Sequence, residues 1–424
     1  METGVERIRQ LAVEHPDRKL QTLMHCVNKE TLMEAHQEQS ARKAAGIDGE
    51  VKTSYAENLE EKIEDLLSRM KQFSYRPQPV RRVYIPKDGG NGQRPLGIPA
   101  YEDKLVQSCM ADVLNAIYET KFYDFSFGYR PGRSPHQAIR YLDNKLMGKT
   151  GYVLDADIKG FFDNVDHKWM MKFLEHDIED KNFLRYVARF LKAGIMEEGK
   201  YAETDAGVPQ GGSISPVLAN VYLHYVVDMW FDVVVKSKVA KGECSMVRFA
   251  DDIVLCFQYE EDMRQVHKAL KDRLSKFGLE LSEEKTKCIK FGRFAGVQAE
   301  HFDFLGFTFI TGKTRNGKYT VIKVTSQKKM KLKRQKAREW LKKNMHEPVA
   351  EIIKRLNLSL RGHYNYYGLS HNLRRMKNFY AYVKRQLRYW LSRRSQKSYI
   401  SWEKLERIMF FNPLLKPTIT NKLW

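Results

Sequence analysis

The pattern of apolar and polar positions is clearest around residues 248–257. Two adjacent acidic residues, Asp251 and Asp252, separate two apolar runs that are rich in β-prone side chains. This pattern predicts a β-hairpin whose tight turn carries carboxylates. Such turns usually contain Asn-Gly or Asp-Gly, whereas paired aspartates are good ligands for hard cations. Taken alone, the hairpin is also compatible with a solvated acidic turn.

A second acidic strand is predicted at residues 152–158. Alternation along this strand places Val153, Asp155 and Asp157 on one face. An aspartate that closes an apolar strand is costly to bury without a cation or a hydrogen-bond donor. If the strand lies beside the predicted hairpin, Asp157 and Asp251 converge, and carboxylates so arranged can hold two Mg²⁺ ions for phosphoryl transfer.

The remaining pattern predicts a mixture of helices and strands. Prolines exclude a helix around residues 75–99, where two basic strands with a Gly-rich turn at 89–92 predict a ribbon. The spacing of apolar residues predicts helices at residues 101–121, 217–227 and 260–277. A further helical region is predicted from residue 328 onward.

Composition identifies a polyanionic partner. The 424 residues carry a formal net charge of +21, which indicates nucleic acid before any other partner. We found no apolar run near the ~20 residues of a membrane-spanning helix and no N-terminal signal segment, so we expect no membrane partner. Five scattered cysteines without a CxxC pair suit a reducing cytoplasm and predict neither disulfides nor a zinc site.

Three motifs in order carry a resemblance to a known family. The segment around Asp157 resembles the first catalytic block of reverse transcriptases, and residues 249–252 resemble the second, with Phe249 where Tyr is usual. The stretch 207–216, Gly-Val-Pro-Gln-Gly-Gly-Ser-Ile-Ser-Pro, is similar to the block between them. Over nearly its whole length the chain resembles the reverse transcriptase–maturases encoded by bacterial group II introns.

The resemblance implies an α+β, right-hand polymerase fold. We expect an N-terminal extension and fingers at 1–150, a palm with an antiparallel sheet at 151–310, and a basic helical thumb or maturase domain at 311–424. Residues 301–307 resemble the primer grip. Asp157, Asp251 and Asp252 are then the catalytic and metal-binding residues, with Mg²⁺ as cofactor and Mn²⁺ as a possible substitute.

The resemblance also assigns nucleotide contacts. Lys87 and Arg94 on the ribbon are expected to contact the triphosphate, Phe162 to exclude a 2′-hydroxyl, and Gln210 to approach the sugar. Lys285 is a candidate proton donor to the leaving pyrophosphate. Solvated charges remain the alternative for Lys87, Arg94 and Lys285.

A capped helix predicts a phosphate contact upstream of the palm. Ser134, Pro135 and Gln137 form the pattern of an N-cap, a first-turn proline and a capping box. Arg130 and Arg133 precede this helix, and helix N-termini attract phosphate. We expect these two arginines to contact the template backbone, with a purely structural capped turn as the alternative.

The C-terminal region is the most basic part of the chain. Nine Lys or Arg residues lie within residues 328–343, with Glu339 as the sole acid. Aromatic rings alternate with cations further along, which is typical of a nucleic-acid-binding bundle. Lys333, Arg334 and Arg361 are the expected contacts. We expect the tyrosines at 364, 366 and 367 to be core residues more often than platforms for base stacking.

These features predict an enzyme that extends a DNA primer on an RNA template with deoxynucleoside triphosphates. We also expect it to bind structured intron RNA as a splicing maturase, in the bacterial cytoplasm. Two alternatives remain: a splicing cofactor that needs no polymerase activity, and a host-adopted relative used in defence or repair. No Cys/His spacing typical of the family's nuclease domain is present, so we expect no endonuclease activity.

Overall fold

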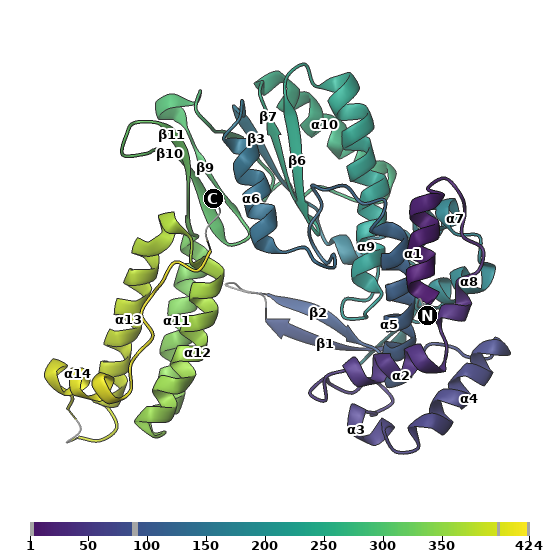
Figure 1. The fold of residues 1–424 in the computed structure, drawn as a ribbon, viewed down its shortest axis with the longest axis horizontal. Helices are drawn as coiled ribbons and strands as arrows, with labels where there is room; N and C mark the ends of the chain where they lie inside the picture. The colour runs from purple at the N-terminus through teal and green to yellow at the C-terminus, as the bar shows by residue number, and fades with distance from the viewer. Residues whose placement is uncertain (1–3, 87–91, 397–398, 422–424) are drawn as a thin grey trace. The chain divides into compact units, whose positions relative to one another are not determined.

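The computed structural model describes residues 4–86, 92–396 and 399–421. These residues form an α+β fold with two compact units. The first unit contains residues 4–86, 92–145 and 149–288, and the second contains residues 146–148 and the described chain from 289 onward. The predicted Gly-rich turn at 89–92 falls largely outside the described residues (Figure 1).

Helices build the N-terminal part of the first unit. Helix α5 (Tyr101–Tyr118), predicted at 101–121, is buried along almost its whole length because neighbouring helices surround it. Helices α1 and α2 both pack against α5. The surrounding helices in this part are α1 (Gly4–Glu14), α2 (Lys29–Glu38), α3 (Lys52–Tyr55) and α4 (Leu59–Lys71).

The predicted ribbon is present and is extended by a second hairpin. Strands β1 (Val80–Pro86) and β2 (Gln93–Ile98) pair antiparallel. Strand β1 also pairs in parallel with β4 (Ile195–Glu197), which forms a hairpin with β5 (Lys200–Ala202). No local pattern predicted this long-range pairing, because β4 and β5 have only three residues each.

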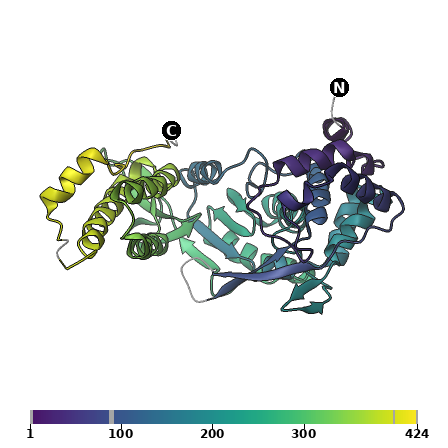
Figure 2. The same cartoon turned by 90° about the horizontal axis from the view of Figure 1, so that it is seen from below.

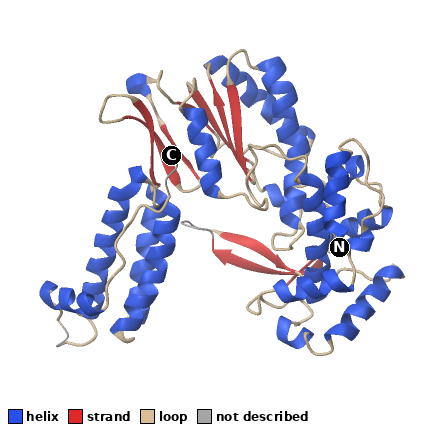
Figure 3. Ribbon diagram, in the orientation of Figure 1, coloured by secondary structure: helices blue, strands red, loops and turns tan. Residues whose placement is uncertain are grey.

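A second sheet carries both acidic segments. Its strand order is β6-β7-β3-β8, and its strands are β3 (Tyr152–Asp157), β6 (Cys244–Phe249), β7 (Asp252–Phe257) and β8 (Lys287–Lys290). Strand β7 is buried from Ile253 to Phe257, whereas in β3 only Val153, Leu154 and Ala156 are buried. Helix α10 (Glu260–Lys276) packs against β3 and β7 (Figure 3).

The remaining helices of the first unit connect and support the two sheets. The predicted capping box is present at the start of α6, where the Ser134 amide donates to the Gln137 side chain over 2.7 Å. These helices are α6 (Pro135–Leu146), α7 (His167–Asp177) and α8 (Lys181–Leu191), with a short 3₁₀ turn at Phe161–Asp163.

A long apolar helix contributes to the core of the first unit. It begins as α9 (Ser215–Leu223) and continues with π-helical segments at His224–Asp228 and Phe231–Val239. Its N-cap is Ile214, and the Ser215 hydroxyl donates to the Pro209 carbonyl over 2.7 Å. Among the described residues, this stretch alone is long and apolar enough to cross a membrane, although we expected none. Its burial inside the unit accounts for that composition.

The second unit combines a three-stranded sheet with a helical bundle. The sheet has the order β11-β10-β9, from β9 (His301–Phe304), β10 (Phe307–Lys313) and β11 (Tyr319–Thr325). Buried aliphatic and aromatic side chains form a separate core between the helices. Figure 2 looks nearly along the axes of the longest of them. The helices are α11 (Gln327–Asn344), α12 (Val349–Tyr367), α13 (Leu373–Leu391) and α14 (Trp402–Phe411).

Candidate active site

The sheet of the first unit brings the three predicted carboxylates together. Strands β3 and β7 pair antiparallel with Asp157 opposite Asp252. Strand β6 pairs with β7 so that Phe249 is also opposite Asp252, which leaves Ala250 and Asp251 in the turn. Asp157 therefore lies at the same end of one sheet as Asp251 and Asp252, which follow it by 94 and 95 positions along the chain.

The turn itself has an unusual backbone. Ala250 adopts a left-handed conformation with φ 57°, which is uncommon for residues other than glycine, and it is buried. The segment at Phe127 and Gly128 passes directly against it: the Phe127 amide donates to the Arg248 carbonyl over 2.9 Å. A Cβ atom at Gly128 would lie 2.2 Å from the Ala250 nitrogen. Only glycine at 128 allows this close backbone approach.

A buried ion pair supports the turn from behind. Arg248, with no exposed side-chain surface, donates to both Asp228 carboxylate oxygens over 2.7 and 2.5 Å. Its remaining terminal nitrogen donates to the Asn220 side chain over 2.9 Å and to the Ala250 carbonyl over 3.1 Å. Asn220 in turn donates to the Gly128 carbonyl over 2.7 Å. This network ties the long helix to the turn at Ala250 and Asp251.

Sequence reasoning missed this network. The available signal was the presence of one charged residue inside each of two apolar runs: Asp228 within residues 217–231 of the long helix and Arg248 in β6. A buried charge needs a partner of opposite sign, so the two residues could have been paired.

His224 provides a pH-dependent contribution next to this network. Burial is the main reason that its pKa falls to about 4. The unfolded chain has an ordinary histidine pKa near 6.5 and binds a proton first, so stability is lost as pH falls from about 6.5 to about 4. We expect about 2–3 kcal/mol less stability from this residue at pH 4.5 than at pH 7.

Urea unfolding at pH 7, 6, 5 and 4.5 measures this loss. His224→Leu removes the titrating group and should flatten the profile by that amount relative to the unsubstituted protein. Parallel pH profiles for the two proteins would contradict the assignment.

Electrostatics at the carboxylates favour a bound cation. The pKa of Asp251 is raised, first by desolvation and then by the charge of Asp157. Asp252 is open to solvent on one side, yet partial desolvation, Asp251 and Asp157 raise its pKa to about 6. The Lys285 ammonium lies 2.7 Å from an Asp157 oxygen, but it is largely exposed and offsets this repulsion only in part.

The donor set fits hard divalent cations. Its carboxylate oxygens are the ligands that Mg²⁺ prefers, and a cation would relieve their mutual repulsion. Among the described residues, no group of three acidic, histidine or cysteine side chains could hold an ion by itself. A site that uses one or two carboxylates and completes its ligands with substrate phosphates fits this arrangement.

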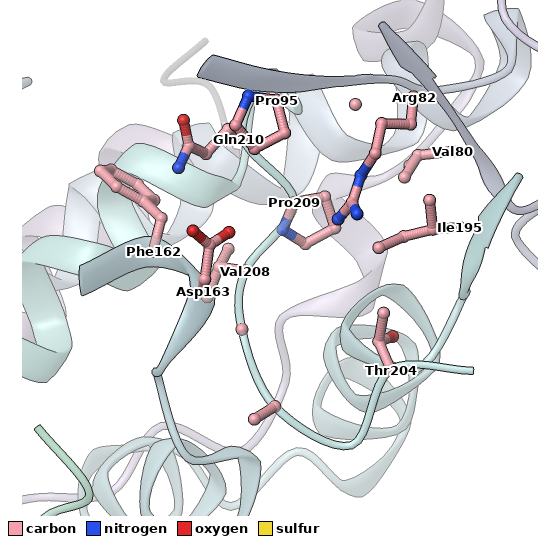
Figure 4. Close-up of a pocket in the computed structure, with 13 residues that line it drawn as sticks. Val80, Arg82, Pro95, Phe162, Asp163, Ile195, Thr204, Val208, Pro209 and Gln210 are labelled. Carbon is pink, nitrogen blue, oxygen red and sulfur yellow. The ribbon is translucent and has the colours of Figure 1, made fainter. Parts of the chain in front are cut away.

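A pocket of the first unit brings Phe162 and Gln210 together (Figure 4). Asp163 also lines this pocket, as do residues of the β1–β2 ribbon, among them Arg82. The Phe162 ring packs edge-on against Phe161 with ring centroids 5.3 Å apart. The two residues that were expected at the nucleotide sugar therefore share one cavity.

The loop before α9 is clamped onto the ribbon. The Gly97 amide donates to the Gln210 carbonyl over 2.6 Å. Gly211 has φ 128°, and a Cβ atom there would lie 2.4 Å from the Gly97 carbonyl oxygen. The close backbone contact therefore requires glycine at position 211. The neighbouring Gln210 lines the pocket.

Of the two residues expected to contact the triphosphate, the structure describes only Arg94. Lys87 lies outside the described residues. Arg94 is exposed on β2, opposite Ile85. The charge of Arg94 lowers the pKa of Asp251 against the larger effect of desolvation, so its guanidinium acts electrostatically on the carboxylate site.

The two arginines before α6 have separate environments. Arg130 is buried, pairs with Glu119 over 2.9 Å and donates to the carbonyls of Tyr123 and Ser126. This enclosure is incompatible with the expected template contact, so we leave Arg130 out of the nucleic-acid surface. Arg133 pairs with Asp124 over 2.7 Å and stays partly exposed, and it remains a proposed contact.

The basic residues of the second unit lie on several faces of its helices. Lys333 is partly buried on α11, next to Lys336. Arg334 lies over the Tyr382 ring, with its guanidinium carbon 5.4 Å from the ring centroid. Arg361 is exposed on α12.

The segment resembling the primer grip forms a tight hairpin. Leu305 and Gly306 both have positive φ, at 48° and 78°. The Tyr366 hydroxyl donates to the Leu305 carbonyl over 2.9 Å, and the Ser326 amide donates to the Gly306 carbonyl over 2.9 Å. The bundle helix α12 therefore holds this turn, while Tyr364 is a buried core ring as expected.

Comparison with known proteins defines the class. Residues 85–309 match the reverse transcriptase (RNA-dependent DNA polymerase) family, and residues 330–408 match the maturase-specific domain of group II introns. The carboxylate site lies inside the first match. The protein is a reverse transcriptase, an RNA-directed DNA polymerase of a divalent-metal-dependent class.

Individual relatives refine this assignment. The group II intron-encoded protein LtrA of Lactococcus lactis subsp. cremoris is 30% identical over 432 residues, covering 82% of this chain and 70% of LtrA. Protein YkfC of Escherichia coli K12 is 31% identical over 357 residues, covering 75% of this chain and 90% of YkfC. The chain belongs to the group II intron-encoded reverse transcriptase–maturases, whose partners are nucleic acids.

Proposed function

We propose that this protein extends a DNA primer on an RNA template, using deoxynucleoside triphosphates and two Mg²⁺ ions, for which Mn²⁺ can substitute. The convergence of Asp157, Asp251 and Asp252 at one end of the palm sheet supports this proposal most directly. Primer extension on an RNA template with Mg²⁺ tests it.

The proposed roles combine the family resemblance with the positions of the described residues. Asp157 and Asp251 hold the ions, and Asp252 supports the site from the same end of the sheet. When bound, the metals lower the pKa of the primer hydroxyl and stabilise charge on the leaving pyrophosphate. Arg94 and Lys87 bind the triphosphate, and Gln210 orients the sugar. Lys285 leaves Asp157 when the site is loaded and donates a proton to pyrophosphate.

Phe162 is proposed to select deoxyribonucleotides. Its flat ring lines the pocket that also contains Gln210. We expect Phe162→Ala to admit ribonucleotides, raising the ratio of ribonucleotide to deoxyribonucleotide incorporation by roughly 100-fold, since a steric clash of about 3 kcal/mol disappears. Competitive incorporation assays measure the ratio.

Phe173→Ala is the control, because it removes a ring that packs against Tyr222 and Tyr225 away from this pocket. Unchanged sugar discrimination in Phe162→Ala would contradict the gate.

We further propose that the second unit binds structured intron RNA and supports splicing. The net charge of +21 and the basic helices support this role. The proposed functional division is fingers at 1–150, palm at 151–310 and thumb or maturase domain at 311–424, in the bacterial cytoplasm. Splicing of the cognate intron RNA at low Mg²⁺, with and without protein, tests the role. A host-adopted enzyme would retain primer extension and leave splicing unchanged.

A further inference from the structure

A groove in the second unit combines an apolar floor with a basic rim. It runs between α11 and α12, and its floor contains Leu356, Leu360, Phe379 and Val383, all of them buried in the core of the bundle. Trp340 of α11 is half-buried and forms part of one wall. We refer to this site as the α11–α12 groove.

The rim carries three cations. Lys333 and Lys336 come from α11 and Arg355 comes from α12. No Asp or Glu is among the described residues that line the groove. Burial and the charge of Lys336 both lower the pKa of Lys333, so the cations at this rim repel one another. An anion would relieve this repulsion.

A second groove of the bundle has a more highly charged lining. On another side of α11, a groove is lined by Lys331, Arg334, Arg338 and Arg375, together with Glu339. Its lining is mainly charged, which suits a phosphate backbone. The α11–α12 groove instead offers apolar surface to a flat ring and cations to an attached anion. A nucleotide whose base has left its stack has both features.

We propose that the α11–α12 groove binds one unpaired nucleotide of an RNA strand, with the base against Trp340 and the apolar floor and the phosphates against Lys333, Lys336 and Arg355. This inference rests on the proposed RNA-binding function of the second unit and gives it a specific site. Base–aromatic contacts of this kind tolerate any base, so the site recognises an unpaired position and not a sequence.

Variants of α12 separate base binding from charge. Ser359 is an exposed residue in the groove wall, and Ser359→Trp fills the groove without changing charge. Arg355→Gln removes one rim cation. Lys354→Gln removes a cation from the adjacent position of the same helix, which pairs with Glu351 and does not line the groove. All three positions are solvent-exposed, so folding should be retained, and thermal unfolding checks it.

The probe is a single-stranded RNA containing 4-thiouridine, cross-linked to the full-length protein and mapped by mass spectrometry. We expect a cross-link in the peptide containing Trp340, retained in Lys354→Gln and reduced roughly 5- to 50-fold in Ser359→Trp and Arg355→Gln. Cross-links within residues 85–288 serve as an internal standard and should not change.

The competing outcomes are distinct. An equal cross-link at Trp340 in Ser359→Trp and the unsubstituted protein would overturn the proposal. So would unchanged competition by an RNA with abasic sites in place of its bases, because the groove would then bind phosphate alone. A change of oligomeric state in Ser359→Trp, with RNA cross-linking intact, would assign the groove to a second copy of the chain. Primer extension is measured in parallel, and its absence would contradict the polymerase proposal without affecting this one.

Discussion

Replacing Asp251 by asparagine is expected to reduce DNA primer extension on an RNA template by about 1,000-fold or more. The substitution keeps the shape of the side chain and removes the negative charge that would hold a divalent cation. Metal-ion stabilisation of a phosphoryl-transfer transition state is worth several kcal/mol, and each 1.36 kcal/mol changes the rate tenfold. Steady-state extension with deoxynucleoside triphosphates and Mg²⁺ measures the effect.

The control for this substitution is Glu280→Gln. Glu280 is an exposed carboxylate whose backbone carbonyl accepts from Lys159 close to the end of β3, and its side chain pairs with Lys159 over 3.3 Å at the surface. Removing its charge should change extension less than about two-fold. RNA binding by Asp251→Asn should also stay within about two-fold. Extension by Asp251→Asn at the rate of the unsubstituted protein would refute the metal site.

Asp228→Ala is expected to lower the free energy of unfolding by about 3–5 kcal/mol. The substitution leaves Arg248 fully buried without its carboxylate partner, and an uncompensated charge in a protein interior is strongly destabilising. Urea unfolding measures the loss. Because Arg248 also donates to the Ala250 carbonyl, we expect primer extension to fall as well.

Two further variants test the physical reason. Asp232→Ala breaks an exposed pair with Lys236 on the same long helix and should cost less than about 1 kcal/mol. The double substitution Arg248→Met and Asp228→Leu removes both charges and should recover much of the stability. It should not recover activity, because the donor to the Ala250 carbonyl in the turn is gone. Equal stability of Asp228→Ala and Asp232→Ala would rule out this account of the network.

Local pattern was sufficient for most elements of this fold. Apolar, β-prone runs predicted β3 and the β6–β7 hairpin, helical spacing predicted α5 and α10, and the Ser134 capping box marked the start of α6. These features depend on neighbouring residues, which the sequence lists in order. The short β4–β5 hairpin was not predicted, since its pairing with β1 joins residues more than 100 positions apart.

The site divides in the same way. The residue types at 157, 251 and 252 and the three motifs indicated metal-dependent chemistry from the sequence alone, because carboxylates at the ends of apolar strands have few structural uses. The environment of each side chain needed the tertiary structure. Arg130 looked like a phosphate contact in the sequence and is enclosed by Glu119 in the fold, whereas Arg248 and Asp228 looked isolated and form the support of the turn.

The sequence by itself determined the identity of the chemical groups, the local elements that carry them and the family of the protein. Tertiary structure alone decided which groups meet: Asp157 opposite Asp252, Gly128 against Ala250, and three cations around the α11–α12 groove. The physical reason is that helical periodicity and side-chain alternation along a strand are set by residues close together in the sequence. Burial, ion pairing and pKa shifts depend on neighbours that only folding brings together.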